Sequence, residues 1–483
     1  MLLVRWALET GISLTPRGAG SGMPGHNVGP GVVVDLTRGF RDPPRIDTRR
    51  RIARVGAALT YMELAVAAAT HGLRLPPDPS SARFCTLGGM AGTNAAGARS
   101  LKYGPMRRWV TELEIVTADG EAGSVGRQAQ TSAEQRFLAD VVPGLDANRR
   151  ELEARRPFTR KNSSGYALFG EPGSRAREVL VGSEGTLAFI TGVAVKLDPV
   201  PARTMTVLLP LLSLDQLPAV LAELDQAQPS AVEMLDRTYL EFIRALGTDL
   251  PEGTEAALLV ELEPDGIEAF RMTTGREDAT IASDDASQAR LWGLRHRASP
   301  ILAGLPTNLR SLQVVEDGCV PREQLATYIT GLREIARRHD FQIVIFGHAG
   351  DGHVHANLLA DVSRPDLADR LGDCLAAASQ LQVALDGTLS GEHGDGRLRA
   401  PFVGRLFGDG YVDWCRKVKQ AWDPAGILNP GVKIPAGPPG IEAGQLKVGP
   451  GAPRLPSGIE SELRRIEKEA AWDSFRLELL AGV

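Results

Sequence analysis

Hydrophobic residues in the first 200 positions recur with two different spacings. They alternate with polar residues in IARVGAAL (52–59) and WVTELEIVTADG (109–120), which predicts strands with one buried face. In YMELAVAAATHG (61–72) they follow a helical spacing that ends at Gly72. The segment EVLVGSEGTLAFITGVAVKL (178–197) predicts a strand, a loop and a second strand.

The pattern changes after Pro199-Val200-Pro201. Longer helical segments then alternate with isolated strands such as AALLVELE (256–263) and QIVIFGH (342–348). This alternation is typical of an α+β domain with a mostly antiparallel sheet. Beyond NPGVKI (429–434), residues 435–457 are rich in proline and glycine, which predicts a linker.

These changes predict two main domains. Residues 1–198, rejoined by 426–434, are expected to form the first domain, and residues 199–425 the second. Residues 458–483 predict a charged C-terminal helix. In the favoured interpretation this helix lies on the chain's own surface, and in the alternative it docks on a partner subunit.

Composition and charge limit the class of protein. Of 483 residues, 43% are hydrophobic and 23% are charged, which suits a globular chain with large cores. The net charge is −5 and no basic block occurs, so nucleic acid is not an expected partner. Arg5 and Glu9 interrupt the apolar opening, which predicts an amphipathic helix rather than a signal peptide. No run approaches the roughly 18 apolar residues of a membrane span, so we expect a cytoplasmic protein.

The cysteines are few and scattered. Cys85, Cys319, Cys374 and Cys415 show no CxxC spacing. An iron–sulfur cluster or zinc knuckle built within this chain is therefore not expected.

Glycine is in excess, at 53 residues, about 11% of the chain against a usual ~7%. It gathers in RGAGSGMPGHNVGPG (17–31), TLGGMAGTNAAG (86–97) and GSEGTLAFITG (182–192). The first stretch is not a Rossmann dinucleotide fingerprint, because Pro24, Pro30 and further glycines forbid the helix that must follow. What remains is a loop with many free backbone N–H groups, which suits anionic oxygens.

The second stretch, 86–97, is expected to be a loop of the same kind, with Thr86 and Asn94 as side-chain hydrogen-bond donors. Two such loops in one domain suit a long ligand with a pyrophosphate in its middle. The alternative, in which each glycine only permits a tight turn, explains single glycines but not their clustering.

Five motifs follow one another in the first 200 residues: PRGAGSG (16–22), PPDPSS (76–81), TLGGMAGTNAAGARSLKYG (86–104), KNSSGY (161–166) and VGSEGTLAFIT (181–191). Together they resemble the FAD-binding domain of the vanillyl-alcohol oxidase superfamily. From about residue 4 to 434 the chain resembles its D-2-hydroxyacid dehydrogenase branch, which includes glycolate oxidase flavin subunits, D-lactate dehydrogenases and D-2-hydroxyglutarate dehydrogenases. The resemblance implies an α+β fold, with a PCMH-type FAD-binding domain over 1–198 and an α+β cap with an antiparallel sheet. The part before the first glycine loop is shorter than is usual for the family.

The resemblance also implies which residues bind FAD. Segments 16–23 and 86–97 would line the pyrophosphate and ribose, and 182–190 the adenine half and the dimethylbenzene side. The expected cofactor residues are Pro16, Arg17, Gly18, Ala19, Gly20, Ser21, Gly22, Pro77, Thr86, Gly88, Gly89, Asn94, Gly97, Gly182, Glu184, Gly185, Ile190 and Asn429. His26 is left unassigned, because this branch usually binds its flavin non-covalently.

The chain contains eight histidines, and four of them lie in FGHAGDGHVHAN (346–357) and SGEHGDGR (390–397). The first stretch predicts a hairpin, in which QIVIFGH is a strand, AGDG a turn and HVHANLL a returning strand. In such a hairpin His348 lies opposite His353.

The alternation of a strand places His353, His355 and Asn357 on one face. Imidazoles held on paired strands are metal-ligand candidates, and Glu392 is expected to complete an open site. The alternative is that these are surface histidines around turns. It explains any single histidine well, but it does not explain why the whole set occurs together.

The family pattern GHxGDGxxH followed by EHG narrows the assignment. It implies His348, His355 and Glu392 as metal ligands, Asn357 as a neighbouring hydrogen-bond donor and His393 as the catalytic base. His353 is the weakest candidate, since relatives often carry asparagine there.

Two histidines and a carboxylate also describe non-haem iron oxygenases, but the flavin loops already provide the redox function. We therefore expect a divalent ion, Zn²⁺ first and Mn²⁺ or Fe²⁺ as alternatives, that acts as a Lewis acid on the substrate hydroxyl. His393 would accept the hydroxyl proton while hydride passes from Cα to the flavin.

The substrate carboxylate needs a cation. LWGLRHRAS (291–299) resembles the family stretch in which an arginine binds it, which implies Arg295, with Arg297 as the second choice. The alternative for Arg295 is a surface salt bridge. D-2-hydroxyglutarate dehydrogenases place a lysine where this chain has Val315, so glycolate or D-lactate is favoured, although Arg310 offers a substitute cation.

An external electron acceptor is expected, because the chain lacks iron–sulfur cysteines of its own. Candidates are a quinone, a cytochrome, an electron-transfer flavoprotein or a separate iron–sulfur subunit, and the partner would bring the protein to the inner membrane. The alternative function is a catalytically weak flavin-bearing scaffold subunit of a multi-protein oxidase. That class loses the histidine and glutamate set, which this chain retains.

Overall fold

The chain forms two compact units. The computed structural model describes residues 1–126, 129–168, 170, 174–244, 250–273, 278–297, 302, 304–306, 308–442, 446, 448–452 and 457–469. Unit 1 comprises Met1–Val200 and Thr388–Pro438, and unit 2 comprises Pro201–Gly387 and Pro439–Val483. The sequence pattern placed the return to the first domain at 426, whereas the second segment of unit 1 begins at Thr388.

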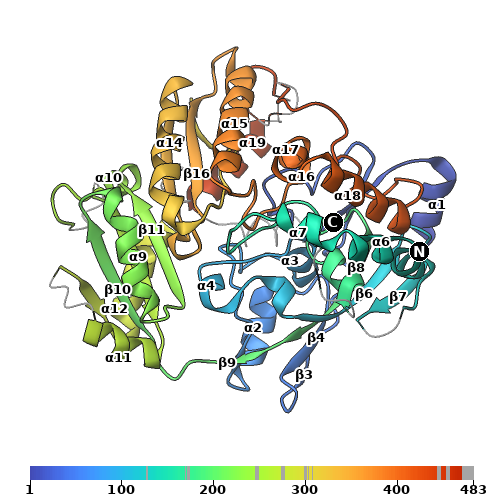
Figure 1. Ribbon diagram of the computed structural model, residues 1–483, viewed down its shortest axis with the longest axis horizontal. Coiled ribbons are helices and arrows are strands. Elements are labelled where there is room, and N and C mark those ends of the chain that lie inside the picture. Colours follow the sequence, from blue (N-terminus) through green and yellow to red (C-terminus); the bar gives the residue numbers. More distant parts are fainter. Residues whose placement is uncertain are drawn as a thin grey trace. The chain divides into compact units, whose positions relative to one another are not determined.

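Unit 1 is built around a five-stranded antiparallel sheet (Figure 1). In spatial order its strands are β3 (Arg45–Asp47), β4 (Ile52–Gly56), β8 (Ala188–Lys196), β6 (Val110–Thr117) and β7 (Ala122–Val125). Two smaller pairs are β1 (Leu14–Arg17) parallel to β2 (Val32–Asp35) and β5 (Leu73–Arg74) antiparallel to β9 (Asp198–Pro199). The strands predicted within 52–59 and 109–120 are β4 and β6, which confirms both predictions.

The helices of unit 1 are short. They are α1 (Leu2–Thr10), α2 (Tyr61–Ala69), α3 (Leu87–Thr93), α4 (Ser100–Tyr103), α5 (Ser132–Arg136), α6 (Val142–Ala147), α7 (Arg149–Ala154), α8 (Arg175–Leu180), α16 (Gly396–Arg399), α17 (Val403–Phe407) and α18 (Asp409–Trp422). The turns η1 (Met106–Arg108) and η7 (Ala400–Phe402) are 3₁₀, and the π-helical turn η2 (Phe137–Val141) joins α5 to α6. The predicted opening helix and the helix predicted within 61–72 are α1 and α2.

The apolar face of α18 explains why unit 1 resumes at Thr388. Tyr411, Cys415, Val418 and Trp422 follow a helical spacing and are buried in the core of unit 1. The Trp422 ring lies 5.9 Å from the ring of Phe137 in η2, centroid to centroid. The segment that the sequence assigned to the second domain therefore completes the first core.

Two predicted elements of unit 1 have a different structure. The apolar run at 178–181 ends helix α8 and is not a strand; the guanidinium of Arg175 bonds to the Leu168 carbonyl and to Asp146, which fixes the start of this helix. Most of the second glycine stretch is helix α3, not a loop. Thr86 caps that helix by accepting the Gly89 N–H, and Asn94 ends it with a left-handed φ of 55°.

Unit 2 contains a seven-stranded antiparallel sheet, as the sequence predicted. Its strands in spatial order are β13 (Thr280–Ala282), β10 (Met205–Leu211), β12 (Ala256–Leu262), β11 (Ala231–Asp236), β15 (Gln342–Gly347), β16 (His355–Asp361) and β14 (Leu309–Leu312). Every residue of β11 and β12 is buried, so both faces of the sheet are covered.

Helices of unit 2 cover this sheet. They are α9 (Leu217–Asp225), α10 (Arg237–Arg244), α11 (Pro264–Thr273), α12 (Asp285–His296), α14 (Leu325–Arg338) and α15 (Leu367–Ala384), with the 3₁₀ turns η4 (Leu214–Gln216), η5 (Arg322–Gln324) and η6 (Ala349–Asp351). Tyr239 and Leu240 of α10 and Leu294 of α12 share a buried cluster with Leu259 and Phe346 of the sheet. Helices α10 and α12 therefore lie on one face.

The C-terminal helix begins close to where the sequence predicted it. Helix α19 spans Ser457–Glu469, and the rest of the predicted helix, residues 470–483, lies outside the described part of the chain. Ile466 of α19 is fully buried.

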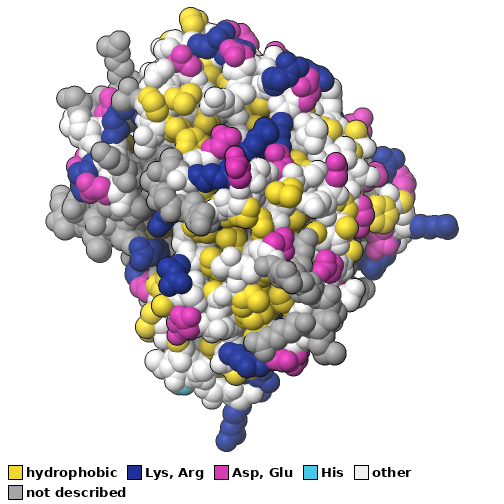
Figure 2. Space-filling model, turned by 90° about the vertical axis from the view of Figure 1, so that its left-hand side faces the viewer, with side chains coloured by type: hydrophobic (Ala, Val, Ile, Leu, Met, Phe, Trp, Pro, Cys, Tyr) yellow, Lys and Arg dark blue, Asp and Glu magenta, His cyan; other side chains and the backbone are white. Residues whose placement is uncertain are grey.

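Charged side chains of both signs are interspersed on the face drawn in Figure 2. Exposed ion pairs in unit 2 include Arg364 with Asp340 and with Asp366. Among the helices in the described residues, none combines the length and apolar character needed to cross a lipid bilayer.

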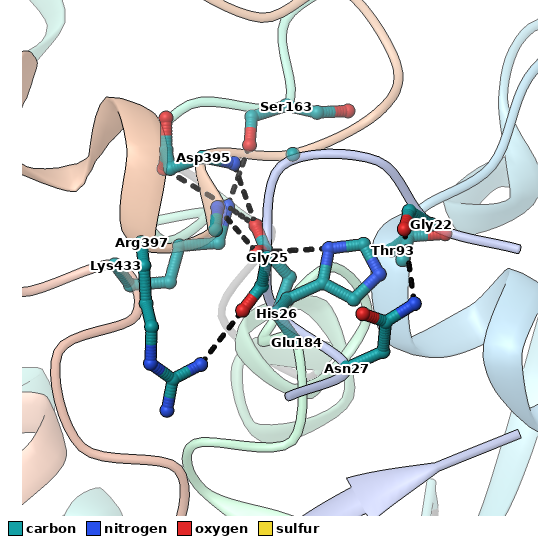
Figure 3. Close-up of polar contacts among 12 residues, drawn as sticks. Gly22, Gly25, His26, Asn27, Thr93, Ser163, Glu184, Asp395, Arg397 and Lys433 are labelled. Carbon is teal, nitrogen blue, oxygen red and sulfur yellow. Dashed lines mark hydrogen bonds and ion pairs between the residues drawn. The ribbon is translucent and has the colours of Figure 1, made fainter. Parts of the chain in front are cut away.

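A buried cluster of charges joins the two segments of unit 1 (Figure 3). The Lys433 ammonium lies 2.7 Å from Glu184 Oε1 and 3.1 Å from Asp395 Oδ2, and it donates to the Ser163 carbonyl at 2.6 Å. Burial alone would lower the pKa of Lys433, but the carboxylates of Asp395 and Glu184 outweigh burial and raise it. The lysine therefore remains charged between two carboxylates.

Glu184 and Asp395 also accept backbone N–H groups. The Asp395 and Gly396 N–H groups donate to Glu184 at 2.8 and 2.7 Å, and the Gly165 N–H donates to Asp395 at 2.7 Å. Charge-assisted bonds of this kind are stronger than neutral ones. They fix the GEHGDGR segment against the first segment of unit 1.

Replacing Lys433 with methionine should destabilise unit 1 strongly. The change leaves the Glu184 and Asp395 carboxylates buried without their cation, which typically costs about 3–5 kcal/mol. The free energy of unfolding from urea denaturation measures this loss. Lys196→Met, at an exposed position of β8, serves as the control and should change stability by less than about 0.5 kcal/mol. Equal stabilities of the two variants would contradict the role assigned to the cluster.

Candidate functional site

Unit 1 contains a cavity of about 190 Å³ lined by the first glycine loop, helix α3 and the loop that carries Glu184. Its walls include these predicted cofactor residues: Pro16, Gly18, Ala19, Gly20, Ser21, Gly22, Thr86, Gly88, Gly89, Glu184, Gly185 and Ile190. Met90 and Thr93, within the predicted segment 86–97, also line it, as do residues for which the sequence predicted no contact with the cofactor, such as His26, Asn27, Pro79, Ser80, Ser81 and Cys85. The segment PPDPSS was part of the family pattern, so Pro79, Ser80 and Ser81 could have been found from it.

The other predicted cofactor residues, Arg17, Pro77, Asn94, Gly97, Gly182 and Asn429, are not among the wall residues. Asn429 bonds to two wall residues, and Asn94 and Gly182 bond to residues outside the wall. Asn94 Oδ1 accepts the Arg107 N–H at 2.9 Å, and the Gly182 N–H donates to the Ala91 carbonyl at 2.9 Å. Asn429 Nδ2 donates to the carbonyls of His26 and Glu184 at 2.8 and 2.7 Å. These bonds fix the backbone that surrounds the cavity.

The first glycine loop presents backbone donors. Within the described residues, the N–H groups of residues 18–22 donate to no protein acceptor. The carbonyls point the other way, since Asn27 Nδ2 donates to the Gly20 and Gly22 carbonyls at 2.9 Å each. No helix follows this loop before residue 61, so the rejection of the Rossmann interpretation is confirmed. A run of unused N–H groups on a cavity wall suits the phosphate oxygens of a nucleotide.

Helix α3 contributes small residues rather than free amides. The Leu87 and Gly88 N–H groups donate to the Leu59 and Ala57 carbonyls, both at 2.8 Å. A Cβ at Gly88 would lie 2.6 Å from the Ala57 Cβ, and a Cβ at Gly18 would lie 2.5 Å from Thr86 Oγ1. Glycine is therefore required at Gly18, where the first loop meets the cap of α3, and at Gly88, where α3 meets the residue after β4.

Glu392 and His393 line the same cavity. Glu392 Oε2 accepts a bond from the buried Lys161 ammonium at 2.9 Å, and Glu392 Oε1 lies 3.5 Å from His393 Nε2. Lys161 also donates to the Gly97 carbonyl at 3.2 Å. Lys161 belongs to the KNSSGY motif, and the sequence predicted no role for it. The Glu184 carboxylate described above holds the turn just after His393, so the imidazole projects from a fixed backbone.

His26 and Cys85 are two further wall residues with altered protonation. The His26 ring lies beside Glu184, with Nδ1 3.5 Å from its Oε2 (Figure 3). Burial lowers the pKa of His26 despite the opposing effect of Glu184. Burial raises the pKa of the Cys85 thiol to about 11. Both groups are therefore neutral near pH 7.

Unit 2 brings three histidines together on the predicted hairpin. Strands β15 and β16 pair Phe346 with His355, and the His353 N–H donates to the His348 carbonyl at 3.2 Å, so His348 and His353 close the hairpin as predicted. The turn between them is the 3₁₀ segment η6, followed by Gly352 with a φ of 72°. One ring nitrogen from each of His348, His353 and His355 lies within 4.8 Å of the other two.

Each of these histidines has a carboxylate partner that the sequence analysis did not identify. His348 Nδ1 bonds to Glu233, His353 Nε2 lies 2.8 Å from Asp317 Oδ1, and His355 Nδ1 lies 3.6 Å from Glu316 Oε2. Because a carboxylate only accepts, it favours the tautomer that carries the proton on the facing nitrogen. For His348 this leaves the lone pair on Nε2, whereas the 3.6 Å contact of His355 is too long for a hydrogen bond.

The two Nε2 atoms of His348 and His355 lie 3.3 Å apart. Two nitrogens about 2.0–2.1 Å from a zinc ion at the tetrahedral angle would be about 3.3–3.4 Å apart. The pair therefore fits a divalent metal. His353 directs Nε2 at Asp317 instead, which separates it from this pair.

Arg295 is partly buried and Asn357 is buried in unit 2. The guanidinium of Arg295 lies 4.5 Å from the Phe346 ring centroid, and its Nε donates to Glu233 Oε2 at 2.8 Å. The Arg295 side chain is 12% exposed and that of Glu233 1%, which differs from the alternative of a surface salt bridge. Asn357 Nδ2 is buried and has no hydrogen-bond partner in the described part of the chain, so a donor is available for a ligand oxygen.

Two family models match the chain. Residues 2–126 match the FAD binding domain, and residues 200–432 match the C-terminal domain of FAD linked oxidases.

Curated proteins and a solved structure extend this match. The chain is 32% identical over 437 residues to a D-lactate dehydrogenase of Archaeoglobus fulgidus, covering 89% of this chain and 87% of the relative. It is 29% identical over 434 residues to glycolate oxidase subunit GlcD of Bacillus subtilis, covering 88% and 84%. A solved structure of alkyldihydroxyacetonephosphate synthase has a TM-score of 0.60 at 17% identity, with 89% of this chain and 74% of that chain covered.

The structural match shows the fold alone, and it agrees with the PCMH-type FAD-binding domain and α+β cap that the sequence predicted. The sequence matches confirm the predicted resemblance, because identity near 30% extends over most of both chains. This chain therefore belongs to the FAD-linked oxidases, the family of oxidoreductases that includes glycolate oxidase subunit GlcD and D-lactate dehydrogenase.

Proposed function

We propose that this protein oxidises a D-2-hydroxy acid to the 2-oxo acid with FAD and a divalent metal ion. The observation that supports the proposal is that Glu392 and His393 line the same cavity as residues 18–22. The backbone N–H groups of residues 18–22 donate to no protein acceptor in the described part of the chain. His393 can accept a proton, and it lies in a cavity suited to a nucleotide. This arrangement suits an oxidation in which a proton and a hydride leave the same substrate.

Bound FAD would supply the hydride acceptor, and a bound divalent metal ion would supply a Lewis acid for the substrate hydroxyl. The chain's own residues would do the rest. The N–H groups of residues 18–22 would hold phosphate oxygens, and His393 would accept the hydroxyl proton on its imidazole. Arg295 would bind the substrate carboxylate, and Asn357 would donate a hydrogen bond to a substrate oxygen.

The metal ligands in this proposal are His348 and His355, whose Nε2 atoms lie 3.3 Å apart. Glu392 as the third ligand stays a prediction of the sequence pattern. Zn²⁺ is the expected ion, with Mn²⁺ or Fe²⁺ as alternatives. Glycolate or D-lactate is the expected substrate, because relatives are named for these acids and Val315 replaces the lysine expected for a second carboxylate. Electrons would pass to a quinone, a cytochrome, an electron-transfer flavoprotein or an iron–sulfur subunit.

Replacing His393 with alanine should leave FAD bound and lower turnover by about 100- to 10,000-fold, because the base that accepts the hydroxyl proton is lost. The visible flavin spectrum measures cofactor content, and dye reduction with glycolate, D-lactate and D-2-hydroxyglutarate measures turnover. His71→Ala, at an exposed position after helix α2, is the matched control. Wild-type rates in the His393→Ala variant would favour the scaffold function instead.

Removing the metal should abolish turnover while the flavin stays bound. His348→Ala and His355→Ala should each lose the metal, measured by elemental analysis of the purified protein, because each removes one nitrogen of the pair. His353→Asn should keep it, because His353 directs Nε2 at Asp317. Full activity of the wild-type protein after complete chelation would end the metal proposal.

A further inference from the structure

Glu233 is a buried acid on the central strand β11, with a side chain only 1% exposed. Its two carboxylate oxygens have different partners. Oε1 accepts the bond from His348 Nδ1, and Oε2 accepts the bond from Arg295 Nε at 2.8 Å. One carboxylate therefore contacts both a proposed metal ligand and the proposed substrate-binding arginine.

The strand register explains this placement. β11 and β15 are antiparallel, with Met234 opposite Gly347 and Leu235 opposite Phe346. Continued by one residue, this register puts Glu233 opposite His348, the first residue after β15. Cross-strand neighbours have their Cβ atoms about 4.5–5.5 Å apart, so the sheet itself sets the distance between the carboxylate and the imidazole.

Arg295 approaches from a different element. It lies near the end of α12 and stacks over the Phe346 ring at 4.5 Å, so its guanidinium is held on one side by an aromatic face and on another by Glu233. Each Glu233 oxygen faces a different donor, so the carboxylate is an acceptor for both neighbours.

From this geometry we infer that Glu233 is a positioning residue that orients His348 for the metal and Arg295 for the substrate carboxylate. The inference rests on the proposed function. Glu233 keeps the proton on His348 Nδ1 and so presents the Nε2 lone pair, and it fixes the rotamer of Arg295 through Nε. It touches neither the metal nor the substrate in this role.

The test is Glu233→Gln. Glutamine has the same shape but only one carbonyl oxygen, so it accepts from His348 or from Arg295 but not from both, and its NH₂ group faces a donor. We expect a 10- to 100-fold loss of Zn²⁺ affinity, measured by titrating metal-free protein with Zn²⁺ against a competing chelator. We also expect a higher KM for the hydroxy acid. Folding is checked by circular dichroism and by flavin content.

Glu261→Gln is the matched control. Glu261 is a buried acid on β12 of the same sheet and accepts the Ser230 hydroxyl at 2.7 Å, a bond that a glutamine carbonyl also accepts. This variant should bind Zn²⁺ like the wild type. If Glu233→Gln does not fold, Glu233→Asp decides: its carboxylate is withdrawn by one methylene, so it cannot reach both partners and Zn²⁺ affinity should still fall.

The outcomes are distinguishable. Zn²⁺ affinity equal to wild type in a folded Glu233 variant would overturn the inference and leave the proposed function standing. A loss in the Glu261→Gln control as large as in the Glu233 variant would also overturn it, because any buried acid of the sheet would then act alike. A wild-type protein that takes up no Zn²⁺, Mn²⁺ or Fe²⁺ would overturn both the metal dependence and the inference, and the wild-type titration alone would reveal this.

Discussion

A lysine between two carboxylates holds unit 1 together. Lys433 comes from the last residues of the unit, Glu184 from its middle and Asp395 from the returning segment, so three distant parts of the sequence meet in one buried group. Isolated buried charges are costly, and this group is stable only when all members are present. Because Glu184 also binds the backbone N–H groups of the two residues that follow Gly394, the same cluster fixes the backbone next to His393.

Buried charged groups in unit 2 also have partners, but they lie on a sheet. Its central strands are buried on both faces, so every polar side chain there needs a partner. Glu233 has His348 and Arg295, Asp236 has Arg333, and Glu261 has Ser230. Of these acids, Glu233 supplies the acceptor where His348 follows the neighbouring strand.

Local patterns predicted strands β4, β6, β8 and β12 and the hairpin of β15 and β16, because alternation and turn chemistry are read within about ten residues. The sequence did not predict the place of α18, since its apolar face shows that it is buried but not against which core. The helix α8 and the helix α3 were also missed, because short apolar or glycine-rich runs do not distinguish a helical turn from a strand or a loop.

In the candidate site, too, local sequence patterns predicted local features but not long-range contacts. Motifs predicted the first glycine loop and the histidines, whose spacing is local. Glu233 and Lys161 lie more than a hundred residues from the groups they contact, Glu233 from His348 and Lys161 from Glu392. Nothing in the spacing of the sequence connects such pairs, and only strand register and the return of the chain at Thr388 bring them together.

The Cys85 thiol has a consequence for chemical durability. Sulfur reacts with peroxides and alkylating agents as the thiolate, and with a pKa of about 11 nearly all of this thiol stays protonated near neutral pH. The sulfur in the cavity wall is therefore one that such reagents attack slowly near neutral pH.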